Sequence, residues 1–139
     1  MKLSLHHVNI SSHDVPGLDA FWGDVMMQED IPELGVLPAL DDGNYAGQVM
    51  FRTDGQVQFH LAEMDLDVAK VQGKAINPLE RGHIAFRTDD IEAFKTHLEE
   101  KGVRYVDYGT TFTKAWYQIF FHHPAGTVIE VHQVLEGEV

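Results

Sequence analysis

The sequence predicts an α+β domain in which two βαβββ modules contribute mixed sheets that curl around a central cleft. Two observations support this prediction: a segment that recurs in the second half of the chain, and a change of hydrophobic period inside each copy. Residues 5–14 align with residues 81–90, because each segment places a His ahead of two alternating apolar residues and an Asp seven positions after that His. Alternation of this kind is typical of a half-buried strand.

After the Asp of each copy, apolar residues recur with the period of an amphipathic helix. They are Leu18, Phe21, Trp22, Val25 and Met26 in the first copy, and Ile91, Phe94 and Leu98 in the second. Asp14 and Asp90 can cap the free N–H groups of the first helical turn, and Gly102 suits a left-handed residue after the second helix. Each module therefore begins with a strand followed by a helix.

Further strand-like runs follow each helix and complete the modules. The two predicted hairpins pair residues 48–52 with 57–62 and residues 116–121 with 127–133, and weaker strands are expected at 31–37 and 104–108. Asp-Gly and Pro-x-Gly sequences supply the hairpin turns. Residues 64–80 are polar and contain Gly73 and Asn77-Pro78, so they are predicted to link a module at about 1–66 to one at about 80–136. Together they form a single domain over residues 1–139.

Composition excludes several classes of protein. The 22 acidic residues outnumber the 10 basic ones and give a formal net charge of -12, which repels polyanions such as nucleic acid. The chain has no Cys, so disulfides, thiolate ligands and a Cys nucleophile are excluded. No apolar stretch has the length of a membrane span, and the N-terminus lacks a cleavable leader pattern. We therefore expect a cytoplasmic protein without membrane or nucleic-acid partners.

Strand alternation predicts that potential metal ligands share one sheet face. In each strand, apolar neighbours that pack against a helix force the intervening polar side chain to the opposite face. The polar residues placed there are His7 and His60 from the first module and His83 and Glu130 from the second. Because this face lacks helices, the sheets are expected to curl toward each other and bring the four side chains to the base of a cleft.

Three imidazoles and a carboxylate favour one divalent transition ion, such as Zn²⁺, Ni²⁺, Fe²⁺, Co²⁺ or Mn²⁺, over Ca²⁺ or Mg²⁺. His132 shares the alternation of Glu130 and is expected to line the cleft without binding the ion. His6 has the opposite alternation and is predicted to be structural or exposed. The remaining histidines, which are expected to be solvated, are His13, His97, His122 and His123.

Three motifs together resemble the vicinal oxygen chelate superfamily, which includes glyoxalases, bleomycin-resistance proteins and extradiol dioxygenases. They are the His7 strand with the helix segment Phe21-Trp22-Gly23-Asp24-Val25-Met26, the segment Gly82-His83-Ile84-Ala85-Phe86, and residues 119–130, which end in Glu130. Trp22 stands where the family has Tyr, and His-Pro-Ala-Gly replaces the usual Asp-Pro-Asp-Gly turn. The resemblance covers nearly the whole chain and is strongest to small glyoxalase-I-like proteins. It implies paired βαβββ modules and metal ligands at His7, His60, His83 and Glu130.

The resemblance also implies a metal-dependent reaction on a small substrate chelated through two neighbouring oxygens. Four protein ligands leave two open positions on an octahedral ion, which favours a glyoxalase-like lyase or isomerase. Glu130 is then a candidate base, and His60 a ligand or an acid or base beside the ion. His60 occupies a position where the glyoxalase has Glu. The alternatives are an extradiol-type dioxygenase, which uses two His and one carboxylate, and a non-catalytic binding protein of the drug-resistance type.

Two further expectations concern the cleft wall and the assembly. The strand-like run near residue 116 is expected to line the cleft and set specificity. Its candidate residues are Lys114, Trp116, Tyr117, Gln118 and Phe120. A homodimer is also expected, because related proteins pair such modules either within one chain or across two chains.

Overall fold

The computed structural model describes residues 1–32, 45 and 47–135. In chain order the elements are β1 (Leu3–Ser12), α1 (Val15–Asp24), β2 (Glu29–Asp30), β3 (Val49–Thr53), β4 (Gln58–Glu63), α2 (Val68–Gln72), β5 (Gly82–Thr88), α3 (Ile91–Glu100), β6 (Val106–Gly109), β7 (Trp116–His122) and β8 (Val128–Val134). The expected helices and hairpins are present within one or two residues of their predicted bounds. The weak strand expected at 31–37 lies mostly outside the described residues.

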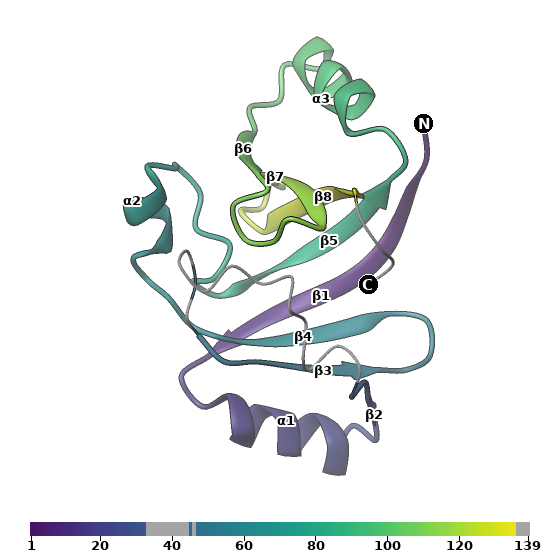
Figure 1. Cartoon of the computed structure of the whole chain (residues 1–139), viewed down its shortest axis with the longest axis vertical. Coiled ribbons are helices and arrows are strands. Elements are labelled where there is room, and N and C mark those ends of the chain that lie inside the picture. The colour runs from purple at the N-terminus through teal and green to yellow at the C-terminus, as the bar shows by residue number, and fades with distance from the viewer. Residues whose placement is uncertain (33–44, 46, 136–139) are drawn as a thin grey trace.

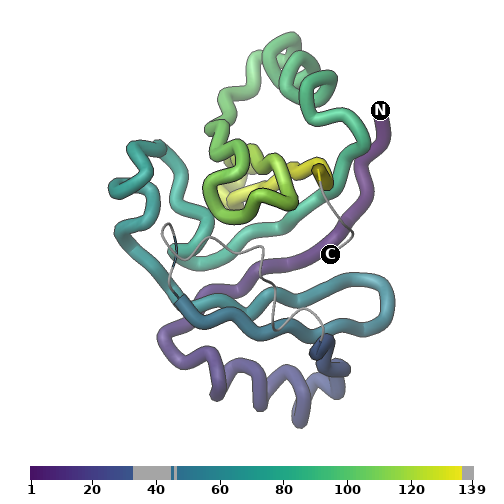
Figure 2. Tube along the Cα trace, in the orientation of Figure 1, coloured from purple at the N-terminus to yellow at the C-terminus, as the bar shows by residue number. Residues whose placement is uncertain are grey.

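The strands form one open, mixed sheet of eight strands in the order β2-β3-β4-β1-β5-β8-β7-β6. Each module has the same internal plan, because β1 pairs parallel with β4 and β5 pairs parallel with β8, while the hairpins are antiparallel. The modules join where β1 and β5 pair antiparallel, and these two strands run side by side through the middle of the molecule (Figure 2). This confirms the α+β architecture of two βαβββ modules.

Two helices lie at opposite ends of the molecule, α1 beside β3 and β4 and α3 near β5 and β8 (Figure 1). The apolar face of α3 is buried against the sheet as predicted, in a cluster of Ile91, Phe94, Leu98, Ile119 and Val131. The first helix is less covered, since Trp22 stacks on Phe59 but Phe21 and Val25 remain exposed. Apolar periodicity therefore identified both helices but overstated the burial of α1.

Local backbone chemistry fixes the start of each helix and the approach of the central strands. The Asp14 and Asp90 carboxylates accept hydrogen bonds of 3.0 Å from the N–H groups of Gly17 and Ala93. At the start of β5, Gly82 has a φ of 134°, and a Cβ there would lie 2.0 Å from the Asn9 carbonyl oxygen. Only glycine permits this close pairing of β1 and β5, which places His83 beside β1.

The segment predicted to link the modules also contributes to the core. Residues 64–80 contain the short helix α2, and Ile76 and Leu79 are buried in a cluster with Tyr108, Phe112 and Phe120. This cluster packs against the sheet face opposite α3. Among the described residues, no helix has the length and apolar character needed to cross a membrane.

Candidate metal centre and its cavity

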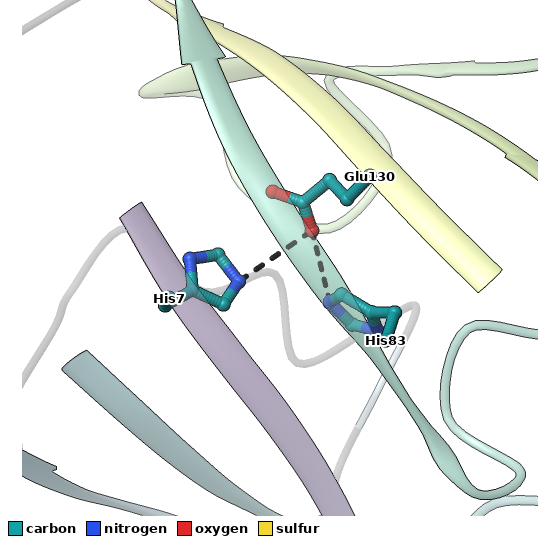
Figure 3. Close-up of side chains that lie close together, drawn as sticks. All are labelled: His7, His83 and Glu130. Carbon is teal, nitrogen blue, oxygen red and sulfur yellow. Dashed lines mark ion pairs between the residues drawn. The ribbon is translucent and has the colours of Figure 1, made fainter. Parts of the chain in front are cut away.

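Three of the predicted ligands meet at the centre of the sheet. His7 lies on β1, His83 on β5 and Glu130 on β8, which are consecutive strands, and all three side chains are buried. Ile129 and Val131 pack toward α3 while Glu130 faces the other way, so the predicted alternation is confirmed there. Figure 3 shows both imidazoles directed at one carboxylate oxygen.

The distances within this group are those of a compact cluster of donor atoms. Glu130 Oε1 lies 3.0 Å from His83 Nε2 and 3.7 Å from His7 Nε2. One potential ligand atom from each residue lies within 4.8 Å of the other two. Two imidazoles and a carboxylate at this spacing match the preferences of divalent transition ions, so the side chains present fit a metal.

His83 and Glu130 are each held by a hydrogen bond on the side-chain atom that does not face the group. His83 Nδ1 donates to the Pro78 carbonyl at 2.8 Å, which leaves the Nε2 lone pair facing Glu130. Glu130 Oε2 lies 2.6 Å from His132 Nδ1, and His132 Nε2 accepts from Arg87 Nε at 2.9 Å. Because a guanidinium only donates, His132 carries its hydrogen on Nδ1 and donates it to Glu130. His132 therefore lies beside the group and supports Glu130, as expected, but its side chain is fully buried and does not line the cleft as predicted.

His6 contradicts its predicted alternation. The pairing of β1 with β5 shifts register between Leu5 and His7, so a β-bulge adds a residue and turns His6 toward the ligand face. Its Nδ1 lies 2.8 Å from His7 Nδ1, and its Nε2 accepts from Arg87 Nη2 at 3.0 Å. His6 is thus a partly buried neighbour of His7.

His60 lies next to the group but is not one of its converging members. Its ring stacks on that of His7, with ring centroids 3.8 Å apart and planes 11° from parallel. Its Nε2 is hydrogen-bonded to Gln58 Oε1 at 2.8 Å, and His60 does not belong to the group whose potential ligand atoms lie within 4.8 Å of one another. The structure therefore brings His7, His83 and Glu130 together, and a fourth ligand at His60 stays a prediction.

The protonation states suit cation binding. Burial, then the charge of neighbouring histidines, lowers the pKa of His7 and of His60 well below the usual value of 6.5. Burial alone would raise the pKa of Glu130, but the electrostatic attraction of His7 and the hydrogen bond from His132 outweigh it and lower that pKa. Near neutral pH His7 is therefore a neutral imidazole and Glu130 a carboxylate, which are the forms of these side chains that bind metal.

A cavity of about 690 Å³, counting the part that opens to solvent, has this group at its base. Its aromatic wall consists of Tyr45, Phe51, Phe112, Trp116 and Phe120. Of the residues predicted to line the cleft, Trp116, Gln118 and Phe120 do so. Alternation along β7 sends Tyr117 to the opposite face, where it bonds to Lys95, and Lys114 is exposed before the strand begins.

Several residues that line the cavity could not be predicted from the sequence, because they lie in irregular segments. Tyr45 and Phe112 belong to neither a helix nor a strand, so no periodicity marked them. Asn9 gave a usable signal, since it alternates with Val8 and Ile10 on the same face as His7. The histidines expected to be solvated behave accordingly at positions 13, 122 and 123, while His97 is half-buried near the Phe94 ring.

Comparison with known proteins identifies the fold. No family model and no curated protein sequence matches the chain. Solved structures do match: a hypothetical protein from Bacillus halodurans C-125 has a TM-score of 0.69 and 17% identity, covering 100% of this chain and 99% of that one. Methylmalonyl-CoA epimerase from Mycobacterium tuberculosis has a TM-score of 0.66 and 20% identity, with coverage of 95% and 88%.

A glyoxalase/bleomycin resistance protein/dioxygenase superfamily member from Vibrio splendidus 12B01 has a TM-score of 0.54 and 16% identity, covering 95% of this chain and 99% of that one. The chain therefore has the vicinal oxygen chelate fold, which agrees with the resemblance seen in its motifs. At these identities the likeness establishes the fold alone.

Proposed function

We propose that the chain binds one divalent transition ion through His7, His83 and Glu130 and catalyses proton transfer on a small substrate with two neighbouring oxygens. This is the activity of a metal-dependent isomerase or lyase. The observation that supports it is the convergence of two imidazoles on Glu130 Oε1 at the base of an apolar cavity. When bound, a divalent ion would stabilise negative charge that develops on the two oxygens.

His60 is the side chain best suited to move the proton. It lines the cavity, and the hydrogen bond that it donates to the side-chain amide oxygen Oε1 of Gln58 fixes the hydrogen on Nε2 and leaves Nδ1 as the accepting nitrogen. Its lowered pKa keeps the ring neutral near pH 7, so Nδ1 is available to take a proton from carbon.

Glu130 is less suited to the role of a mobile base. His83 and Gln118 contact its Oε1 and His132 holds its Oε2, so the carboxylate is fixed from both sides. We therefore assign Glu130 to ion binding and His60 to proton transfer.

The neighbours in structure support proton-transfer chemistry on this fold. Several are methylmalonyl-CoA epimerases, including one in complex with methylmalonyl-CoA. Epimerisation removes a proton from carbon and returns it to the opposite face, which is the type of step assigned here to His60.

One observation favours a second candidate, an extradiol-type dioxygenase. The converging group contains two His and one carboxylate, and His60 bonds to Gln58 rather than joining it. A set of two His and one carboxylate is the ligand pattern of non-haem iron oxygenases, which need open positions for substrate and oxygen.

Solvent exchange at carbon separates these two candidates. Protein loaded with Zn²⁺ or Co²⁺ is incubated in D₂O with 2-hydroxy-1-phenylethanone, and NMR follows deuterium entry beside the carbonyl. We expect metal-dependent exchange that falls at least about a hundredfold in His60→Ala, while the matched control His13→Ala, an exposed histidine, retains it. Absence of exchange, together with oxygen-dependent ring cleavage of catechol by the anaerobically prepared Fe²⁺ form, would replace this proposal with the dioxygenase.

A further inference from the structure

We infer that the cavity selects an uncharged, largely aromatic ligand and discriminates against substrates with a carboxylate or phosphate on the part that fills the cavity. This inference names the substrate class of the proposed metal site and rests on the proposed function. Three observations support it: the aromatic wall, the absence of Lys and Arg from the described residues of the lining, and the neutral polar groups beside Glu130.

The wall offers flat apolar surfaces from several directions. Trp116 and Phe120 project from β7, Phe51 from β3, and Tyr45 and Phe112 from irregular segments. Phe112 is itself held in place, because it stacks on Tyr108 with ring centroids 5.1 Å apart. A rigid aromatic wall binds planar apolar groups by burying their surface and by ring contacts.

None of the described residues that line the cavity is Lys or Arg. The remaining stretches, residues 33–44, 46 and 136–139, contain neither residue type in the sequence. Arg87 lies 5.4 Å from the Trp116 ring, but its guanidinium bonds to His132 and His6. A second negative charge on a ligand would be desolvated without a cationic partner, in a chain whose net charge of -12 already repels anions.

The polar groups beside Glu130 suit a hydroxyl rather than an ion. Gln118 donates through Nε2 to Glu130 Oε1 at 3.3 Å, while its Oε1 is buried without a hydrogen-bond partner among the described residues. Asn9 and Thr113 also line the cavity and are neutral. An unpaired buried acceptor favours a ligand that brings a donor, so a hydroxyl next to a second oxygen complements this end of the cavity.

Three chelators with the same pair of hydroxyls test the inference: catechol, 4-ethylcatechol and 3,4-dihydroxybenzoate. Calorimetry and the visible spectrum of the Co²⁺-loaded protein report binding, and each affinity is divided by that of the same chelator for free Co²⁺. We expect 4-ethylcatechol to bind about tenfold more tightly than catechol, because two more carbons are buried. We expect 3,4-dihydroxybenzoate to bind at least about tenfold more weakly than catechol.

Equal or tighter binding of 3,4-dihydroxybenzoate would overturn the substrate class and leave the metal site standing. If the protein holds Co²⁺ and none of the chelators changes its spectrum, the proposed function fails and the substrate class fails with it.

A positive charge introduced into the cavity wall provides a second, independent test of the inference. Val49 lines the cavity and is half-buried, so Val49→Lys adds a cation at a position that tolerates exposure, and Val49→Gln is the matched neutral control. With Co²⁺ content equal in both variants, Val49→Lys should improve the relative affinity for 3,4-dihydroxybenzoate about tenfold over Val49→Gln. An unchanged preference would show that charge does not set selectivity and would contradict the inference.

Discussion

Glu130 Oε2 accepts a hydrogen bond of 2.6 Å from His132 Nδ1. Arg87 Nε donates to the other ring nitrogen of His132, Nε2, and so keeps the hydrogen of the imidazole on Nδ1. The bond turns the carboxylate so that Oε1, its other oxygen, faces His7 and His83. A buried residue outside the proposed ligand set can therefore determine how well the proposed ion would be held.

Replacing His132 should weaken metal binding without removing a ligand. His132→Phe preserves a ring that can stack on Trp116, 4.2 Å away in the native chain, but removes the donor to Glu130. We expect a loss of about 10- to 100-fold in Zn²⁺ affinity, measured by competition with a chromophoric chelator. His132→Gln retains a side-chain donor and should recover part of the loss. Native affinity in His132→Phe would show that the bond does not support the site.

His60 should matter to turnover and little to metal content. His60→Phe retains a ring beside His7 and removes the nitrogen assigned to proton transfer. We expect close to one ion per chain together with at least about a hundredfold slower exchange at carbon. Metal analysis and NMR exchange on the same preparation check both values. Loss of the ion in this variant would instead identify His60 as a fourth ligand.

The two-module plan followed from the repeated segment and its change of hydrophobic period. The shared face of His7, His83 and Glu130 followed from strand alternation, because alternation depends only on which neighbours are apolar. Ile129 and Val131 flank Glu130, and this pattern alone placed the carboxylate on the correct face. Alternation holds only while pairing is regular. At His6 a β-bulge interrupts the pairing, and a bulge leaves little trace in a single sequence.

The hydrogen-bond partners that orient the candidate site's histidines could not be predicted from the sequence. The hydrogen bond between His60 Nε2 and Gln58 Oε1 orients the imidazole ring. Strand alternation predicts the face of the sheet on which a side chain lies, but it does not predict how the ring is oriented there. Likewise, nothing in the polar segment 64–80 indicated that the Pro78 carbonyl would hold His83 Nδ1. Such contacts depend on the packed fold, so the sequence could propose a four-residue set but not rank its members.

Stability of the metal-free chain should fall as pH decreases from 8 to 5. Burial holds the pKa values of His7 and His60 below 6.5, so below that pH the unfolded chain binds more protons than the folded chain. Each group can then remove up to about 1.4 kcal/mol per pH unit from the free energy of unfolding. The lowered pKa of Glu130 adds a further loss below about pH 4.5.

Urea unfolding in the presence of a metal chelator measures this dependence. His60→Phe removes one titrating group and should show a shallower slope between pH 7 and 5. Stability that stays constant or rises over this interval would contradict the assignment of buried neutral imidazoles.

We predict that the chain forms a homodimer, although His7, His83 and Glu130 converge within one chain. Apolar side chains at the end of α1 remain exposed, including Val25 at 61% and Met27 at 82%. Burying such surface against a second copy would remove it from water. Light scattering at micromolar concentration should give twice the monomer mass, and Val25→Glu should shift the mass toward the monomer. A monomeric native protein would rule this out.

The most direct test of the metal centre is the ion content of the purified chain. Protein equilibrated with Zn²⁺ and then desalted should retain close to one ion per chain by elemental analysis. His83→Ala and Glu130→Ala each remove a converging ligand and should sharply reduce retention, whereas His123→Ala, at an exposed position, should not. Native occupancy in both ligand variants would contradict a metal centre at His7, His83 and Glu130.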